Sequence, residues 1–98
     1  MGYVYIMTNT GNNVLYIGVT SNLVRRVAEH VGGSGSAFTR KYNCHKLVYY
    51  EVYQSIGEAI DRETRLKWWR REWKRSLVEK MNPGWVDLGD GLVENPMG

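Results

Sequence analysis

The sequence has few of the residues from which cross-links, metal cages and membrane anchors are built. Cys44 is the only cysteine among the 98 residues, so an internal disulfide is excluded, as is typical of a reducing compartment. One cysteine and two distant histidines, His30 and His45, are too few for a structural zinc site, so any metal is expected to be held mainly by oxygen. No apolar run approaches the roughly 18 residues of a membrane span, and no signal-peptide pattern opens the chain. We therefore expect a cytoplasmic protein without a membrane partner.

The rest of the composition is that of an ordinary folded domain. Apolar residues make up 43% of the chain and aromatic residues 12%, which argues against disorder. A chain of 98 residues can bury one modest core but not two. Because the Asn82-Pro83 pair is expected to end the last helix, we predict a domain over residues 1–88 and a flexible tail over residues 89–98.

The chain opens with two short apolar runs joined by a polar turn, "YVYIMTNTGNNVLYIG". We predict strands over residues 3–8 and 14–19. Strict alternation turns three aromatic side chains away from the aliphatic face of this hairpin: Tyr3, Tyr5 and Tyr16. Gly18 lies beside them and leaves room for another group to approach the backbone. Alternation alone leaves open whether these tyrosines pack under a helix or take part in chemistry.

The remaining pattern predicts helices near residues 22–31 and 56–80, with a third strand over residues 46–53. Ser55 and Glu58 form a capping box at the start of the longer helix. An unbroken helix of this length would be unusual, so we expect a break near residues 68–71. The fold class predicted is α+β, with a three-stranded antiparallel sheet flanked by helices.

Two features on these helices are candidates for chemistry. Arg26 and His30 are four residues apart and border the apolar stripe of the first helix. Glu63 falls on the apolar stripe of the longer helix, where a carboxylate is costly unless it is paired or bound to a cation. Structural alternatives remain open: Glu63 could form a buried salt bridge with Arg26 or Arg62, and His30 could be a partly buried helix residue. Arg26 could also form a surface ion pair.

The segment from residue 61 to residue 80 concentrates positive charge. It carries eight basic and four acidic residues, and tryptophans are interleaved with the bases: Trp68, Trp69 and Trp73. This composition suits phosphate contact and base stacking. The alternatives are a solvated helix face whose tryptophans pack inward, or a docking patch for a protein partner.

Several segments, taken in order, resemble a known family. "YVY" is followed by "YIG" and "GVTSNLVRRVAEH", and then by "FTRKY", "EAIDRETRLKWW" and "MNPGWVDL". Over residues 2–88 this order resembles the GIY-YIG endonuclease family, in particular its small bacterial single-domain branch, which is related to the nuclease domain of the excision-repair subunit UvrC. The resemblance implies hydrolysis of DNA phosphodiester bonds with Mg²⁺ or Mn²⁺, in DNA repair or recombination.

The resemblance also implies roles for individual residues. Tyr16 matches the tyrosine that activates or orients the attacking water, and Tyr5 matches the one that helps to order that water and the phosphate. A phenol is a weak acid, so a base role requires a neighbour or a metal to remove the proton of Tyr16. Arg26 would clamp a phosphate oxygen, and His30 would relay a proton or bind phosphate. Glu63 would ligate the divalent ion, which takes its other ligands from water and substrate.

Further residues are expected to support the site or the substrate. Gly18 is expected to let a phosphate come close, and Asn82 to fix the C-terminal segment with Trp85 as its packing anchor. Contacts with the DNA backbone are assigned to basic residues around the cleft and on the basic helix: Arg25, Arg40, Lys41, Arg62, Arg70, Arg71 and Lys74. A domain this small has little surface for reading sequence, so we expect a preference for branched, nicked or single-stranded DNA.

Two positions depart from the family pattern. Tyr3 stands where the family has the glycine of its first motif, and Val19 stands where repair relatives have a lysine that contacts the site. The alternative function is a nucleic-acid-binding module or a protein-interaction domain that keeps the fold without cleaving. Loss of Glu63 or Arg26 would mark such a module, and their presence favours the enzyme.

Overall fold

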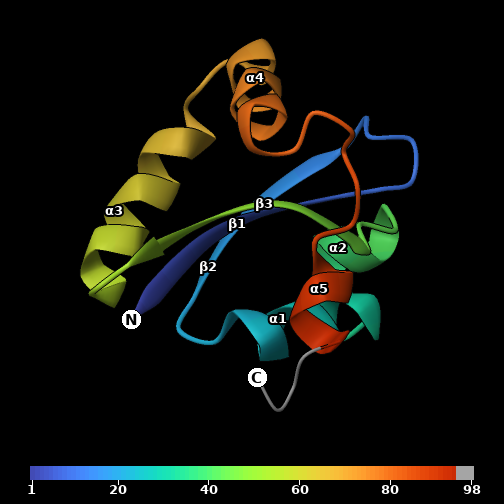
Figure 1. The fold of residues 1–98 in the computed structure, drawn as a ribbon, viewed down its shortest axis with the longest axis horizontal. Coiled ribbons are helices and arrows are strands. Elements are labelled where there is room, and N and C mark those ends of the chain that lie inside the picture. The colour runs from blue at the N-terminus through green and yellow to red at the C-terminus, as the bar shows by residue number, and fades with distance from the viewer. Residues whose placement is uncertain (95–98) are drawn as a thin grey trace.

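A computed structural model describes residues 1–94 of the chain. The elements follow one another along the chain as in Figure 1: β1 (Gly2–Thr8), β2 (Leu15–Thr20), α1 (Leu23–Val31), α2 (Ala37–Lys41), β3 (Lys46–Tyr53), α3 (Ile56–Lys67), α4 (Arg71–Met81) and α5 (Gly89–Glu94).

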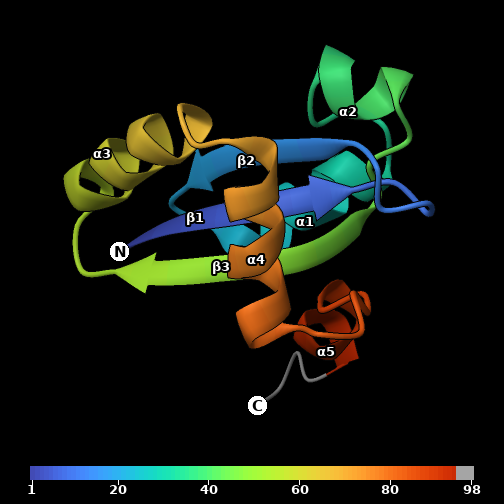
Figure 2. The ribbon, with the colours of Figure 1, turned by 90° about the horizontal axis from the view of Figure 1, so that it is seen from above.

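The three strands form one antiparallel sheet in the order β2-β1-β3. The helices lie on both sides of this sheet, with α3 and α4 on one side and α1 and α5 on the other (Figures 1 and 2). The prediction of an α+β fold is therefore confirmed. Because β1 is the central strand and is covered on both faces, most of its side chains are buried.

Alternation along β1 divides the interior into two cores. Val4 and Ile6 point to the core beneath α3 and α4, where they pack with Ala59 and Leu66. Tyr5 and the side chains on its face of the sheet pack in a second core with residues of α1. The predicted separation of tyrosines from aliphatic residues is confirmed, since Tyr3 and Tyr16 also pack against this second core.

Local capping signals set the helix ends. The Ser55 hydroxyl accepts a hydrogen bond from the backbone N–H of Glu58 at 3.2 Å, so the Ser55 half of the predicted capping box is present. The Glu58 carboxylate accepts from the Ser55 hydroxyl at 3.1 Å instead of from a backbone N–H. The predicted break in the following helix lies over residues 68–70, between α3 and α4. Among the described residues, no helix is both long enough and apolar enough to cross a membrane.

The predicted flexible tail over residues 89–98 is wrong for residues 89–94, which form α5. Leu88 and Leu92 pack against the second core, and the backbone N–H of Leu88 donates to the Leu47 carbonyl at 2.7 Å. A short glycine-containing segment has little helical propensity of its own, so this burial against β3 and α1 is what stabilises it. The rest of the predicted tail, residues 95–98, lies outside the described residues.

Candidate active site

A buried hydrogen bond joins the central strand to the first helix. The Tyr5 hydroxyl lies 2.7 Å from Nε2 of His30, and the two residues are 1% and 0% exposed. Gly18 faces Tyr5 across the strand pair, and a Cβ at this position would overlap the Tyr5 ring. The expectation that Gly18 leaves a gap for phosphate is therefore wrong: the aromatic ring of Tyr5 fills that gap.

Arg26 meets the same phenol from α1. Its Nε donates to the Tyr5 oxygen at 3.3 Å, and its Nη1 donates to the Glu29 carboxylate at 3.1 Å. The hydrogen bond to Tyr5 is the main reason that the pKa of Arg26 is raised. The predicted neighbours Arg26 and His30, one helical turn apart, thus converge on one oxygen atom. The surface ion pair considered for Arg26 is also present, with Glu29 as its partner.

His30 is held on its other side by a residue of α2 that was not among the candidates predicted from the sequence. Its Nδ1 lies 2.9 Å from the hydroxyl of Thr39, which is itself buried. The Thr39 hydroxyl also lies 2.9 Å from the Ser36 hydroxyl and 3.3 Å from the Ser36 carbonyl. When it donates to Ser36, its oxygen accepts a proton from Nδ1. In this arrangement Nε2 has no proton and accepts the hydrogen bond from Tyr5. A Cβ at Gly35 would overlap the imidazole, so a glycine is required there.

Burial keeps both members of the Tyr5–His30 pair neutral. It raises the pKa of Tyr5 to about 12, against a smaller lowering effect of the Arg26 hydrogen bond. Burial, followed by the positive charge of Arg26, lowers the pKa of His30 to about 4. Both shifts oppose transfer of the Tyr5 proton to His30. This pair is suited to holding a geometry and not to generating a base.

Tyr16 occupies a different position in the same cluster. Its ring lies edge-on to His30, with centroids 5.4 Å apart, and is 6.4 Å from the ring of Tyr5. Phe38 of α2 packs against it at 5.7 Å. Tyr16 is only half-buried, and its phenol oxygen has no hydrogen-bond partner within residues 1–94. Of the two motif tyrosines, Tyr16 is the one whose hydroxyl is available to a water or a substrate.

Glu63 lies on α3, and its side chain is 15% exposed. Burial is the main reason that the pKa of Tyr5 is raised, and the negative charge of Glu63 adds a small contribution in the same direction. Neither alternative considered for its partner is found: Glu63 pairs with Lys67 at 3.0 Å, while Arg62 is held by Glu51 through two nitrogens. The carboxylate is therefore neutralised by a half-exposed, flexible cation.

The donor set sets a limit on any bound metal. In the part of the chain that the structure describes, no group of three or more histidine, cysteine, aspartate or glutamate side chains could hold an ion. A single carboxylate such as Glu63 is compatible with Mg²⁺, which keeps several waters and shares oxygens of a bound phosphate. One carboxylate is too few to bind an ion whose ligands all come from the protein.

The basic residues selected from the sequence have different surroundings. Arg25, Arg40, Lys41 and Arg70 are exposed and Lys74 is half-buried, which leaves these side chains at the surface. Arg71 instead donates to the Asn13 carbonyl in the turn between β1 and β2. Arg62 is engaged by Glu51 and lies over the ring of Trp69. Arg62 and Arg71 therefore have structural partners in addition to any substrate.

Asn82 and Trp85 organise the segment that follows α4. The Asn82 amide donates to the carbonyls of Val48 and Val86 at 3.1 and 2.8 Å and accepts from the Val86 N–H at 3.0 Å. Trp85 is buried in the first core with the guanidinium of Arg75 over its ring. Both side chains tie the C-terminal segment to β3, and neither hydrogen-bonds to the tyrosine cluster.

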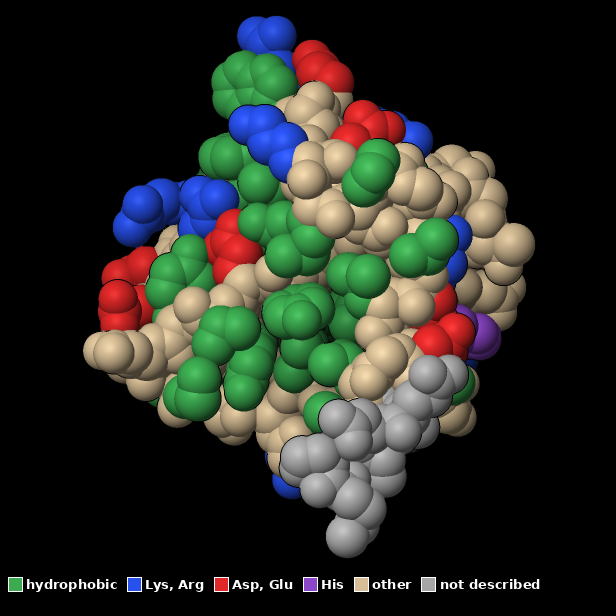
Figure 3. Space-filling model, viewed as in Figure 1, with side chains coloured by type: hydrophobic (Ala, Val, Ile, Leu, Met, Phe, Trp, Pro, Cys, Tyr) green, Lys and Arg blue, Asp and Glu red, His purple; other side chains and the backbone are tan. Residues whose placement is uncertain are grey.

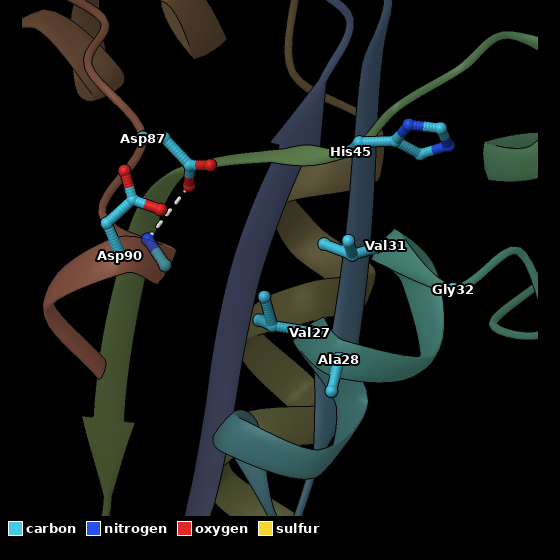
Figure 4. A pocket seen from close by; sticks show the side chains of 8 residues that line it. Val27, Ala28, Val31, Gly32, His45, Asp87 and Asp90 are labelled. Atoms are coloured by element: carbon cyan, nitrogen blue, oxygen red, sulfur yellow. Dashed lines mark hydrogen bonds between the residues drawn. The ribbon is translucent and has the colours of Figure 1, made fainter. Parts of the chain in front are cut away.

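A hollow of about 610 Å³ lies on another part of the surface, between α1 and α5 (Figure 4). Its floor is apolar, with Val27 and Val31, and its rim carries His45, Asp87 and Asp90. The His45 ring points away from the two aspartates in Figure 4. These polar groups therefore do not form a second catalytic cluster.

The candidate residues are an arginine and a half-buried phenol beside the rigid Tyr5–His30 pair, with a single carboxylate, Glu63, on α3. A family model described as the GIY-YIG catalytic domain matches residues 1–76, which include all five of these residues. The chain therefore belongs to the GIY-YIG family, whose domain is a nuclease-type hydrolase.

Relatives with the same domain agree over most of their length. A UPF0213 protein of Staphylococcus haemolyticus is 37% identical over 78 residues, which are 80% of this chain and 94% of that protein. A UPF0213 protein of Natronomonas pharaonis is 40% identical over 76 residues, or 78% and 88% of the two chains. The solution NMR structure of a UPF0213 protein from Bacillus halodurans has a TM-score of 0.56 at 30% identity, and the match covers 89% of this chain and 93% of that one.

Proposed function

We propose that the protein is a divalent-metal-dependent endonuclease that hydrolyses DNA phosphodiester bonds. The observation that carries this proposal is the convergence of Arg26 and His30 on the Tyr5 oxygen beside a half-exposed Tyr16. Such a rigid cluster, with Glu63 on α3, can position a phosphate, a water and a cation with little rearrangement beyond the displacement of Lys67.

The protein residues have separate tasks in this reaction. Tyr16 would orient the attacking water through its phenol oxygen. It could take the proton of that water only as a phenolate, after its own proton had passed to solvent under the charge of the bound cation. Arg26 turns the exposed part of its guanidinium to a nonbridging phosphate oxygen, where charge accumulates during attack. Tyr5 and His30 are positioning residues: they fix Arg26 and the ring of Tyr16 through contacts that are already made in the free protein.

Glu63 is the residue that would hold Mg²⁺ or Mn²⁺. A cation bound there supplies charge neutralisation for the phosphate and for the departing oxygen. Lys67 neutralises the carboxylate in the absence of the cation and must move aside when the cation binds. Because Lys67 is more than half exposed, this displacement costs little.

The substrate is proposed to be DNA with a branch, a nick or a single-stranded region, in cytoplasmic repair or recombination. The exposed cations Arg25, Arg40, Lys41 and Arg70 suit contacts with phosphates, which position a strand without reading its sequence. The domain offers no large surface with which to enter a groove, so selectivity for DNA shape is expected over selectivity for sequence.

Cleavage assays test this proposal directly. Branched, nicked, single-stranded and duplex DNA, with matched RNA, are incubated with Mg²⁺, with Mn²⁺ or with EDTA. We expect cleavage of DNA only with a metal, and its loss in Glu63→Gln and Arg26→Ala. Asp61→Asn is the matched control for Glu63→Gln, because it removes one negative charge from an exposed position of the same helix. Cleavage in EDTA, or undiminished cleavage by Glu63→Gln, would contradict the mechanism.

A further inference from the structure

Two of the four tryptophans lie open to solvent where α3 ends and α4 begins. Trp68 is the C-terminal cap of α3 and is 86% exposed, and Trp73, in the first turn of α4, is 51% exposed. By contrast, Trp69 packs against the first core and Trp85 is buried in it. A large aromatic ring gains more from burial than most side chains, so two exposed rings within six residues of the chain indicate a surface that another molecule covers.

Positive charge surrounds these rings. From residue 64 to residue 75 the chain has six basic residues and one acidic residue: Arg65, Lys67, Arg70, Arg71, Lys74 and Arg75, with Glu72. In Figure 3, lysine and arginine side chains lie beside hydrophobic ones over the upper part of the molecule, where Figure 1 places the end of α3 and α4. The occupant that complements this surface is an anion with planar apolar groups.

The underlying rings are fixed in place. The guanidinium of Arg70 lies 5.5 Å from the centroid of Trp73, and Trp69 meets Trp73 nearly at a right angle, with centroids 6.2 Å apart. Arg62 lies over Trp69 at 5.1 Å and is anchored by Glu51. Trp68 stands next to this stack with its ring almost entirely in solvent, so a planar group has access to it.

The location of Trp68 relates it to the proposed reaction. It follows Glu63 by five residues of α3, which is about 7–8 Å along a helix axis. Lys67, its neighbour in the chain, reaches the Glu63 carboxylate at 3.0 Å. The same five residues turn the helix by about 140°, so a strand whose phosphate lies at Glu63 would follow the surface of α3 to reach the Trp68 ring. The hollow between α1 and α5 is lined by other elements.

We propose that Trp68 is a stacking site for an unpaired base of the nucleic-acid substrate, with Arg70 and Lys74 beside it for the adjoining phosphates. The proposal rests on the proposed function, since it takes the substrate to be a nucleic acid. Bases within a duplex already stack on both neighbours, so the site acts on flaps, gaps, frayed ends and single strands. Stacking of this kind tolerates every base, because each has a flat π-face.

Binding measured in EDTA tests the site without cleavage. Fluorescence anisotropy compares a short oligothymidylate, the same backbone with abasic sites, and a blunt duplex, each with wild type, Trp68→Ala and Trp68→Phe. We expect Trp68→Ala to lose about 5- to 100-fold in affinity for the oligothymidylate. We expect less than a twofold change on the duplex and the abasic strand, and partial recovery in Trp68→Phe. Val86→Ala, which trims another exposed apolar side chain, should bind as wild type does.

The outcomes separate this proposal from the nuclease proposal. Unchanged affinity of Trp68→Ala for the oligothymidylate, or an equal loss on the duplex, would overturn the stacking site and leave the surface to a protein partner. Wild-type affinity that is the same for the abasic strand and the oligothymidylate would overturn it as well. If the expected binding differences are found but no DNA is cleaved with any metal, the stacking site stands and the nuclease proposal falls.

Discussion

The ring of Tyr5 fills the space that a side chain at Gly18 would occupy. The two residues are cross-strand partners in β1 and β2, and the phenol of Tyr5 is pinned beyond them by His30 and Arg26. The glycine of the YIG motif is therefore needed for the position of the buried tyrosine. Gly18 therefore allows Tyr5 to pack in its observed position and does not leave a gap for a substrate.

This relationship predicts the effect of Gly18→Ala. The added methyl group must push aside a ring that is held by two hydrogen bonds, and overpacking of this kind typically costs about 1–3 kcal/mol. We expect a loss of that size in urea unfolding, with reduced cleavage. Gly57→Ala is the matched control, because this glycine lies in α3 and an added Cβ would meet only the Ser55 hydroxyl, at an ordinary contact distance of 3.9 Å. It should be neutral or stabilise the protein by up to about 1 kcal/mol. Equal effects of the two substitutions would contradict the crowding argument.

The buried histidine predicts how stability depends on pH. The pKa of His30 is about 4 in the folded protein and lies near its ordinary value of about 6.5 in the unfolded chain. Between these values the unfolded state binds more protons, so stability falls as the pH is lowered from 6.5 to 4. The full effect of this group is roughly 3 kcal/mol.

Variants of the two histidines isolate this contribution from that of the carboxylates. His30→Gln should show a smaller loss of unfolding free energy between pH 7 and pH 4 than wild type. His45→Gln, at an exposed position, is the matched substitution of the other histidine. If His45→Gln flattens the profile and His30→Gln does not, the assignment to His30 is wrong.

The hydrogen bond between Thr39 and His30 predicts that substitution of Thr39 lowers stability, although no sequence motif includes this residue. Thr39→Val keeps the shape of the side chain but leaves Nδ1 of His30 buried without its partner, which costs about 1–3 kcal/mol. Thr39→Ser keeps the hydroxyl and should lose much less, apart from the missing methyl group. Thermal unfolding of the two variants measures the difference. Near-equal stability of the valine and serine variants would show that the hydrogen bond to His30 does not contribute to the free energy of unfolding.

How far the sequence predicts this protein depends on the range of the interactions involved. Alternation and capping are local, so the hairpin faces, the capping box and the break after α3 follow from short patterns. The helix α5 does not, because it forms on a surface made by β3 and α1. Thr39 was missed for a similar reason. Its only local signal is the Ser36 cap of a five-residue helix, and its contact with His30 requires that helix to fold back on α1.

The charged residues show the same division. The sequence places Glu63 on an apolar stripe but offers several cations as partners. Arg62, its neighbour in the chain, pairs with Glu51. The Glu51 carboxylate also accepts hydrogen bonds from the hydroxyls of Tyr49 and Tyr53. That leaves Lys67, one helical turn away, as the partner of Glu63. Competition among several long side chains is decided by the packed structure, which a linear pattern does not contain.

The Glu63–Lys67 pair predicts how cleavage responds to metal concentration. Lys67 competes with a divalent ion for the carboxylate, and an exposed pair of this kind is worth up to about 1 kcal/mol. Lys67→Met should therefore lower the Mg²⁺ concentration for half-maximal cleavage by up to about fivefold. Lys80→Met, at an exposed position of α4, should leave it unchanged. A higher Mg²⁺ requirement in Lys67→Met would mean that the lysine assists the cation instead of competing with it.

The two motif tyrosines are expected to fail in different ways when their hydroxyls are removed. Tyr5→Phe leaves Nε2 of His30 buried without a donor, so it should lower the unfolding free energy by about 1–3 kcal/mol. Tyr16→Phe removes a hydroxyl that makes no hydrogen bond within residues 1–94, so its stability should stay close to wild type. Its kcat should instead fall by about 10²- to 10⁴-fold, the usual contribution of a general base.

Tyr3→Phe, on the same face of β1, serves as the control for removing a phenol from this sheet and should change neither quantity. Cleavage by Tyr16→Phe at the wild-type rate would show that another group activates the water. That group is not Tyr5 if Tyr5→Phe lowers stability and leaves kcat unchanged.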